Sequence, residues 1–204
     1  MKNVKPVSFV LDGRKVTALE GESIWQVAKR LGTSIPHLCY SEQKGYRSDG
    51  NCGACMVEVE GERTLAASCV RAPAEGMVVN TATARAQKSR KLVFELLAAD
   101  QPSREAHPDP DSSFWKWTDS VGAEAGRMPK LKDVPRDISH SAIHVNLDAC
   151  INCNLCVRAC REVQSNDVIG MAYRGHGSQI VFDFDDPMGD STCVACGECV
   201  QICP

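Results

Sequence analysis

Hydrophobic and polar residues alternate along the N-terminal part of the chain in the pattern typical of β-strands. The first such segment covers 7–11, a turn signal follows at Asp12 and Gly13, and the segment 15–18 completes a predicted hairpin. Three later segments carry the same signal for short strands: 56–60, 64–67 and 78–79. This part of the chain therefore contains enough strands for a small sheet.

A helical period lies between the hairpin and the later strands. Apolar residues within 24–31 recur with the i, i+3, i+4, i+7 spacing of one buried helix face. Ser23 and Gln26 match a capping box at its start, and Gly32 is suited to end it. A hairpin, a helix and further strands together predict an α+β protein that begins with a β-grasp domain.

A second helix is predicted over 83–101, because apolar residues mark one side of it and Pro102 stands beyond its end. Four basic residues occupy its first turns: Arg85, Lys88, Arg90 and Lys91. They favour a solvated helix face, with a docking patch for an acidic partner as the alternative.

The stretch 102–138 contains five of the ten prolines and is expected to be an ordered linker or an interface arm. Phe114, Trp115 and Trp117 lie inside it. Aromatic residues gathered in a linker either pack back on their own domain, which is the commoner case, or are buried by a partner.

Further strands are expected near the C-terminus, at 143–146, 168–172 and 179–184, with a turn over 186–189. The pattern as a whole predicts three parts. They are a β-grasp domain over 1–82, a helix and Pro-rich linker over 83–138, and a second small domain over 139–204.

Composition limits the class of protein. The chain has 204 residues, of which 43% are hydrophobic, 24% charged and 5% aromatic, so its cores are expected to be small and aliphatic. The formal net charge of −3 argues against a general nucleic-acid binder, which would be basic. No apolar run approaches the roughly 18 residues of a membrane-spanning helix. The first residues also lack the pattern of a secretory signal.

Twelve cysteines are the most informative part of the composition. Without a secretory signal, a reducing, cytoplasmic compartment is expected, where cysteines at this density are metal ligands and not a disulfide framework. A cysteine-free stretch over 70–149 separates four early cysteines from eight late ones. This division predicts two metal-bearing modules.

The eight late cysteines form an internal repeat. Each half has the spacing C-x2-C-x2-C-x3-C, over 150–160 and again over 193–203, which is the bacterial ferredoxin run. Three closely spaced thiolates hold the corners of one cubane, and the fourth reaches the other cluster. One [4Fe–4S] cluster is therefore assigned to Cys150, Cys153, Cys156 and Cys203, and the other to Cys160, Cys193, Cys196 and Cys199.

Structural zinc is the competing interpretation of these runs. Zinc sites typically pair two short C-x-x-C units across a longer stretch, which the uneven spacing does not match. Pro204 follows Cys203, as the ferredoxin motif requires, whereas Arg161 follows Cys160. We interpret that departure as a local change in the exit turn and not as a lost ligand.

The early cysteines have the spacing C-x12-C-x2-C-x13-C, which differs from the plant-type run but suits a [2Fe–2S] cluster. Gly50, Gly53 and Ala54 flank the close pair, and such small residues let backbone amides approach cluster sulfurs. On spacing alone, a zinc site remains the alternative here. His37 neighbours Cys39 and His107 opens the linker, so a cluster ligand is the alternative role for either. Because four cysteines are already available per cluster, surface or packing roles are favoured for all five histidines: His37, His107, His140, His144 and His176.

Four segments resemble the N-terminal region of the catalytic α subunit of NAD-dependent, molybdenum- or tungsten-containing formate dehydrogenase: 35–39, 51–61, 145–150 and 193–199. The likeness covers essentially the whole chain. The layout is similar, more broadly, to the large iron–sulfur subunit of respiratory complex I and the diaphorase iron–sulfur subunit of NAD-reducing hydrogenases. The resemblance implies a [2Fe–2S] cluster held by Cys39, Cys52, Cys55 and Cys69, followed by two [4Fe–4S] clusters.

Two features depart from this resemblance. Many relatives hold an extra [4Fe–4S] cluster through a His-x3-Cys-x2-Cys-x5-Cys motif, which is expected to be absent here because no cysteine lies between Cys69 and Cys150. That departure favours formate dehydrogenase over the hydrogenase and complex I types. The molybdopterin-binding part would follow residue 204, and the second ferredoxin half stops at Pro204, so the C-terminal domain is expected to be truncated.

The resemblance implies an oxidoreductase that oxidises formate at a molybdenum– or tungsten–pterin centre and passes electrons to an FMN-containing subunit that reduces NAD. All twelve cysteines are assigned to clusters and no nucleotide-binding motif occurs, so this stretch is predicted to conduct electrons without a catalytic residue of its own. The expected partners are the molybdopterin part and the flavin- and NAD-binding iron–sulfur subunit, with no nucleic acid or membrane. The alternative is a stand-alone electron-transfer subunit of a hydrogenase or complex I type.

Overall fold

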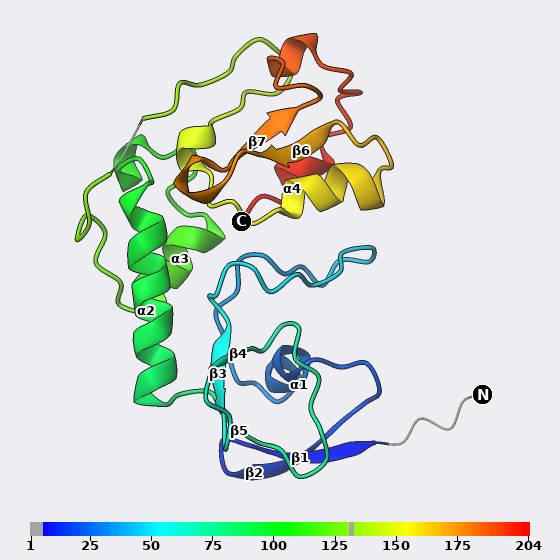
Figure 1. The fold of residues 1–204 in the computed structure, drawn as a ribbon, viewed down its shortest axis with the longest axis vertical. Helices are drawn as coiled ribbons and strands as arrows, with labels where there is room; N and C mark the ends of the chain where they lie inside the picture. The colour runs from blue at the N-terminus through cyan, green and yellow to red at the C-terminus, as the bar shows by residue number, and fades with distance from the viewer. Residues whose placement is uncertain (1–5, 131–132) are drawn as a thin grey trace.

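The computed structural model describes residues 6–130 and 133–204, which form an N-terminal and a C-terminal module (Figure 1). The predicted hairpin is confirmed: β1 (Val7–Leu11) pairs antiparallel with β2 (Arg14–Ala18). Its turn residues Asp12 and Gly13 have φ values of 49° and 76°. Two consecutive left-handed residues match the right-handed twist of the strands, which is why Asp-Gly is favoured there.

Three further strands complete a mixed sheet in the order β2-β1-β5-β3-β4. They are β3 (Met56–Val59), β4 (Ala66–Ala67) and β5 (Val78–Asn80). β5 runs parallel to β1, and β3 runs antiparallel to both β5 and β4. This is the β-grasp arrangement, so the predicted α+β class and its N-terminal fold are confirmed, although β4 is shorter than the predicted segment 64–67.

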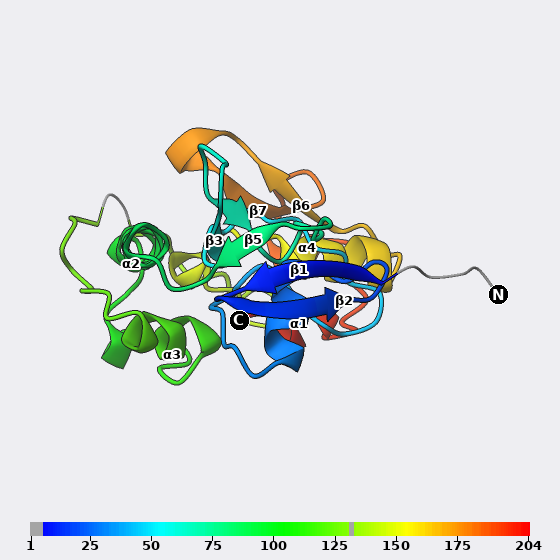
Figure 2. The same ribbon diagram turned by 90° about the horizontal axis from the view of Figure 1, so that it is seen from below.

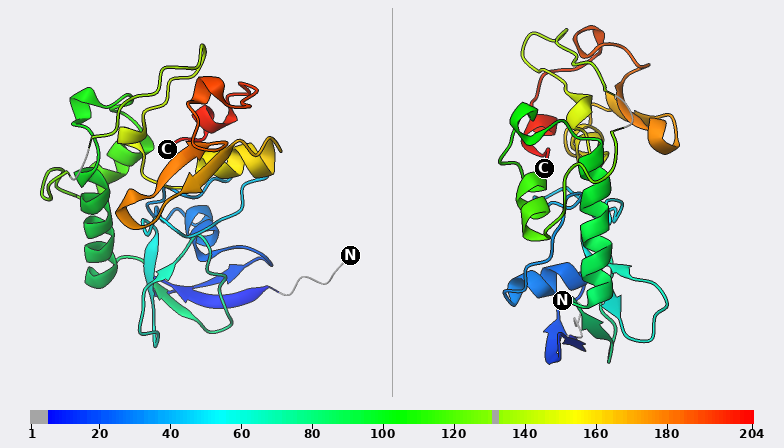
Figure 3. Two further views of the ribbon diagram at one scale, coloured as in Figure 1. Left: turned by 45° about the horizontal axis from the view of Figure 1, so that its top comes forward. Right: turned by 90° about the vertical axis from the view of Figure 1, so that its left-hand side faces the viewer.

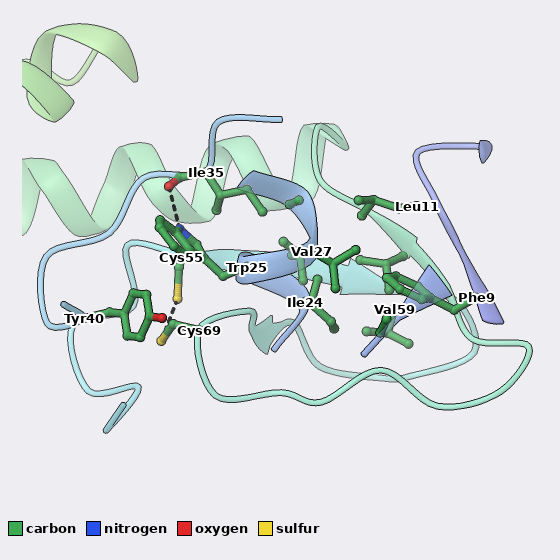
Figure 4. Close-up of a cluster of buried hydrophobic side chains, with 14 residues drawn as sticks. Phe9, Leu11, Ile24, Trp25, Val27, Ile35, Tyr40, Cys55, Val59 and Cys69 are labelled. Atoms are coloured by element: carbon green, nitrogen blue, oxygen red, sulfur yellow. Dashed lines mark hydrogen bonds between the residues drawn. The ribbon is translucent and has the colours of Figure 1, made fainter. Parts of the chain in front are cut away.

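Helix α1 (Ile24–Arg30) packs beside the β1–β2 hairpin (Figure 2). Both bonds of the predicted capping box are present, since Ser23 Oγ accepts from Gln26 N at 3.3 Å and Gln26 Oε1 accepts from Ser23 N at 2.8 Å. The buried face of the helix shares one hydrophobic core with the inward residues of the strands (Figure 4). Cys55 and Cys69 belong to that same core.

Helix α2 (Ala84–Ala99) extends from the sheet towards the C-terminal module (Figure 3). Thr83 caps it by accepting from Ala86 N at 3.2 Å, as the predicted start requires. The expectation of a wholly basic solvated face was wrong for Arg90. That side chain is 7% exposed and donates from Nε to the backbone oxygen of Met56 at 2.8 Å, because it lies against β3.

The predicted linker contains a helix that no sequence pattern predicted, α3 (Ser113–Ser120), after the short turn η1 (Arg104–Ala106). Ser112 caps α3 by accepting from Trp115 N at 3.5 Å. Phe114 and Trp115 are buried, and the rings of Phe114 and Phe94 of α2 lie 6.1 Å apart. Of the two interpretations of these aromatic residues, packing back on their own chain holds for Phe114 and Trp115.

The C-terminal module is built around a two-stranded antiparallel sheet, in which Ile169 pairs with Phe182. Its elements in chain order are η2 (Leu147–Ala149), α4 (Leu155–Arg158), the π-turn η3 (Ala159–Val163), β6 (Ile169–Ala172), η4 (Gly175–Gly177), β7 (Gln179–Phe182), η5 (Met188–Asp190) and α5 (Glu198–Gln201). β7 ends earlier than predicted, because Asp183 has a φ of 45°.

The predicted strand over 143–146 was wrong. Val145 makes only an isolated bridge with Asp137, and the chain then turns into η2. Among the described residues, no helix is both long and apolar enough to cross a membrane.

Candidate metal centres

Two of the four early cysteines, Cys55 and Cys69, lie at the end of the N-terminal core away from Phe9 (Figure 4), and Cys39 and Cys52 belong to the adjoining hydrophobic group that also contains Cys153. Cys39 lies in the loop after α1, Cys52 and Cys55 precede β3, and Cys69 follows β4. The Sγ atoms of Cys55 and Cys69 are 3.3 Å apart. The thiol of Cys39 is within hydrogen-bonding reach of those of Cys52 and Cys69. The structure therefore brings all four predicted ligands together.

Crowding changes the acidity of these thiols. Hydrogen bonds with Cys52 and Cys69 lower the pKa of Cys39. A hydrogen bond with Cys69 likewise lowers the pKa of Cys55, against the opposing effect of burial. The pKa values of Cys52 and Cys69 are raised by the same contacts and by burial. Cys39 and Cys55 therefore ionise more readily than an isolated cysteine, and thiolate is the form of cysteine that binds metal.

Small residues and hydrogen-bond donors surround this group. Gly50 has a φ of 66°, and a Cβ built on it would lie 2.7 Å from a methyl group of Val70, so only glycine fits. The backbone N–H of Ala54 donates to Cys52 Sγ at 3.4 Å. Among the described residues, Ser48 Oγ is buried without a hydrogen-bond partner, and it acts on the Cys69 thiol as a minor cause that opposes the rise in the pKa of that thiol. Donors aimed at sulfur are what a thiolate-held cluster requires, so these residues fit a [2Fe–2S] cluster.

The sequence repeat of the late cysteines is also a repeat of backbone conformation. Asn152 and Asn154 flank Cys153 with φ values of 52° and 63°, and the equivalent Ala195 and Gly197 have 55° and 76°. In each run the first of these residues donates its N–H to the preceding cysteine sulfur at 3.4 Å. Left-handed residues in such turns direct backbone N–H groups towards the cysteine sulfurs, as the binding of a [4Fe–4S] cluster requires.

Four of the late cysteines line a single hollow: Cys160, Cys193, Cys196 and Cys199. Cys160 comes from the other sequence run and accepts a hydrogen bond at Sγ from Val168 N at 3.3 Å. Burial raises the pKa of Cys199 to about 11, and the neighbouring thiols of Cys193, Cys196 and Cys160 add to the effect. These contacts bring together the four residues predicted for one [4Fe–4S] cluster.

Ile202, which directly precedes Cys203, packs in one buried group with Cys153 and Leu155 of the first run. Burial raises the pKa of the Cys203 thiol, and the charge of Cys150 adds to the shift. The pKa of Cys156 is raised by burial and then by Cys153, Cys150 and Cys203. This crosswise proximity matches the predicted second group. All twelve cysteines are free thiols, and the assignment of each one to a cluster stays a prediction.

Three of the histidine rings have partners other than the cysteine groups. His37 packs edge-on against Trp25 with 4.5 Å between ring centroids, and burial lowers its pKa. His107 packs against Trp115 in the same manner at 5.8 Å. His176 Nε2 lies 3.0 Å from Asp100 Oδ2 at the surface.

Two protein-family models match the chain. A 2Fe-2S iron-sulfur cluster binding domain matches residues 4–84, and a 4Fe-4S dicluster domain matches residues 149–204. The chain is an iron–sulfur protein. Its cofactors are one [2Fe–2S] cluster and the two clusters of a 4Fe–4S dicluster domain, as predicted, which removes the zinc alternative for the early cysteines.

Curated relatives of this iron–sulfur protein are distant. It is 31% identical to the NADP-reducing hydrogenase subunit HndD of Solidesulfovibrio fructosivorans, over 97% of the chain and 35% of that protein. It is 32% identical to the mitochondrial NADH-ubiquinone oxidoreductase 78 kDa subunit of Candida albicans, over 88% of the chain and 25% of that protein. A third relative, named "Putative formate dehydrogenase SH0748" from Staphylococcus haemolyticus, is 26% identical over 95% of the chain and 20% of its own length.

The iron–sulfur protein thus spans about a third or less of the length of these relatives. It is distantly similar, over most of its own length, to a part of subunits named as a hydrogenase, an NADH-quinone oxidoreductase and a putative formate dehydrogenase. Among solved structures, the NAD+-reducing [NiFe]-hydrogenase in its H2-reduced state superposes with a TM-score of 0.81 and 24% identity, over 93% of this chain and 80% of that chain. That likeness shows the same fold.

Three polar residues near the cysteine loops were not predicted from the sequence: Ser48, Asn51 and Arg158. Two of them have a sequence signal, since Asn51 directly precedes the predicted ligand Cys52 and Arg158 is a charged residue inside a ferredoxin run. The burial and contacts of Arg158 follow from the docking of the two modules, which no local pattern reports.

Proposed function

We propose that this iron–sulfur protein conducts electrons as part of an NAD-dependent formate dehydrogenase. The observation that carries the proposal is the gathering of the twelve cysteines into three groups of four. One group is assigned to the [2Fe–2S] cluster and two to [4Fe–4S] clusters, with the ligands given above. When bound, such clusters take up and release single electrons with little rearrangement of the protein.

Proximity of the cysteine groups supports a linear route. Cys39 and Cys153 belong to one hydrophobic group, together with the buried side chains of Leu155 and Ile202. The charge of Cys199 also contributes to the raised pKa of Cys156, which indicates that the two groups of late cysteines are close to each other. We infer the order [2Fe–2S], then the cluster of the first run, then the cluster of the second run.

Two enzymes are candidates for the larger assembly. The motif resemblance and the lack of a cysteine between Cys69 and Cys150 support formate dehydrogenase, with a molybdopterin part and a flavin- and NAD-binding subunit as partners. The 31% identity to a hydrogenase subunit supports the alternative, a hydrogenase or complex I-type assembly. In both cases, the chain would be one electron-conducting part of a multisubunit oxidoreductase.

An affinity tag on this chain in its natural host tests the proposal. The complex would be isolated without oxygen, analysed for molybdenum, tungsten and nickel, and assayed for NAD reduction by formate and by H2. Formate-dependent reduction with molybdenum or tungsten is the expected result, whereas H2-dependent reduction with nickel would favour the alternative. The reconstituted chain by itself should give paramagnetic signals after reduction by dithionite but no formate-dependent dye reduction.

A further inference from the structure

Arg158 carries a charge in the interior of the protein. Its side chain is 2% exposed, at the point where the C-terminal end of α4 meets the loops of the N-terminal module. A buried charge is costly unless hydrogen bonds and a counter-charge compensate it. The partners of Arg158 therefore indicate why it is there.

The guanidinium bonds to the backbone of both modules. Nη2 donates to the carbonyl oxygen of Cys39 at 2.7 Å and to that of Cys153 at 3.3 Å. Nη1 donates to the carbonyl oxygen of Arg47, and Nε to that of Asn154 at 3.3 Å. A single nitrogen thus joins the peptide of a [2Fe–2S] ligand to the peptide of a [4Fe–4S] ligand.

The counter-charge comes from the N-terminal module. Asp49 Oδ2 lies 3.2 Å from Arg158 Nε, and the Asp49 side chain is 18% exposed. The planar fork of arginine can serve several acceptors in fixed directions at once, which the compact ammonium of lysine cannot do. The site is therefore built for arginine and not for positive charge alone.

We propose that Arg158 is a positioning residue for electron transfer between the [2Fe–2S] cluster and the adjacent [4Fe–4S] cluster. The proposal rests on the proposed function. In the step concerned, one electron leaves a reduced [2Fe–2S] cluster and enters an oxidised [4Fe–4S] cluster, or the reverse, and no bond forms or breaks. Arg158 holds the two ligand loops in contact and supplies a hydrogen-bonded path between them. Its positive charge also favours the reduced, more negative state of both clusters.

The test uses the full chain, reconstituted without oxygen, with four variants: Arg158→Gln, Arg158→Lys, the double variant Arg158→Gln/Asp49→Asn, and the control Arg47→Gln. Arg47 also bridges the modules, since its Nε lies 2.9 Å from Glu162 Oε1. Its Nη1 lies 2.9 Å from Asp49 Oδ1, but its side chain is 66% exposed, so its loss leaves Asp49 paired with the buried Arg158. The readouts are iron and sulfide content, the midpoint potential of each cluster by EPR-monitored titration, and the magnetic interaction between the two reduced clusters.

We expect Arg158→Gln to lower both midpoint potentials and to weaken the magnetic interaction. Arg158→Lys keeps the charge and should retain the potentials, yet it should weaken the interaction because one ligand peptide is released. In the double variant the potentials should return towards the wild-type values while the interaction stays weak. Arg47→Gln should match the wild-type protein in both readouts.

Wild-type potentials and interaction in both Arg158→Gln and Arg158→Lys would overturn the proposal, as would an equal loss in Arg47→Gln. If Arg158→Gln fails to bind iron, the potentials and the magnetic interaction of Arg158→Lys and of the double variant test the proposal instead. A failure of the proposed function would look different, because the isolated complex would then not reduce NAD with formate, whereas the cluster potentials of the Arg158 variants would still shift.

Discussion

The side-chain amide of Asn51 donates a hydrogen bond to the backbone oxygen of Cys153, 3.3 Å away, across 102 positions of the chain. Asn51 directly precedes Cys52, so a cysteine loop of one module holds a cysteine loop of the other. Tyr46 Oη adds a second such contact by donating to Glu198 Oε1 at 2.8 Å. The modules therefore dock through the loops that carry the candidate ligands, and not only through α2 and the segment after it.

The reconstituted chain should contain about ten iron atoms and a similar amount of acid-labile sulfide, since one [2Fe–2S] and two [4Fe–4S] clusters sum to that value. Anaerobic analysis of iron, sulfide and zinc on the purified protein measures it. Stoichiometric zinc with little sulfide would contradict the cluster assignment, and about fourteen iron atoms would mean a further cluster.

Replacing Cys203 should damage the cluster of the other sequence run. In Cys203→Ala, we expect loss of the [4Fe–4S] signal assigned to Cys150, Cys153 and Cys156, because Ile202 packs with Cys153 and the charge of Cys150 contributes to the raised pKa of Cys203. EPR and Mössbauer spectra of the reduced variant check this, with Cys199→Ala as the matched variant for the second cluster. Loss of only the second cluster in Cys203→Ala would show that the ligands do not cross between runs.

Removing the Ser48 hydroxyl should lower the midpoint potential of the [2Fe–2S] cluster. Among the described residues its buried Oγ has no hydrogen-bond partner, and it acts on the Cys69 thiol, so it is free to donate to a ligand sulfur. Such a donor stabilises the more negative, reduced cluster. Redox titration of Ser48→Ala measures the effect.

Ser41→Ala is the control for Ser48→Ala, because Ser41 Oγ accepts from Gln43 N in the same long loop at 3.2 Å. Its potential should equal that of the wild-type protein. An unchanged potential in Ser48→Ala would mean that the hydroxyl does not reach the cluster sulfur.

Packing between α2 and α3 should contribute strongly to stability. Phe94 is fully buried against Phe114, so Phe94→Ala should cost about 3–5 kcal/mol and lower the thermal midpoint by roughly 10 °C. Leu96 lies on the same helix but is 55% exposed, so Leu96→Ala should change stability by less than about 0.5 kcal/mol. Thermal scans followed by circular dichroism compare the two. Equal midpoints would show that α3 does not pack on α2.

The sequence by itself predicted the parts of this protein that depend on near neighbours. The start of α1 was predicted from Ser23 and Gln26, because the hydrogen bonds of a capping box join residues only three positions apart. The spacing of the two cysteine runs predicts iron–sulfur binding for the same reason, since three ligands of each [4Fe–4S] cluster come from one short loop. The turn at Asp12 and Gly13 follows from the φ values that those residues tolerate.

Only the tertiary structure decided the rest. Arg90 and Arg158 are charged residues in patterns that indicate solvent or a ligand loop, yet both are buried by contacts with distant strands and loops. Helix α3 is short and lies among prolines, so its sequence gives no helical pattern. Its apolar face is recognised only in the structure, where it packs against α2. Each of these features rests on contacts between residues tens of positions apart. These features are stabilised by the burial of side chains where distant segments pack together, and no periodic pattern along the chain reports such packing.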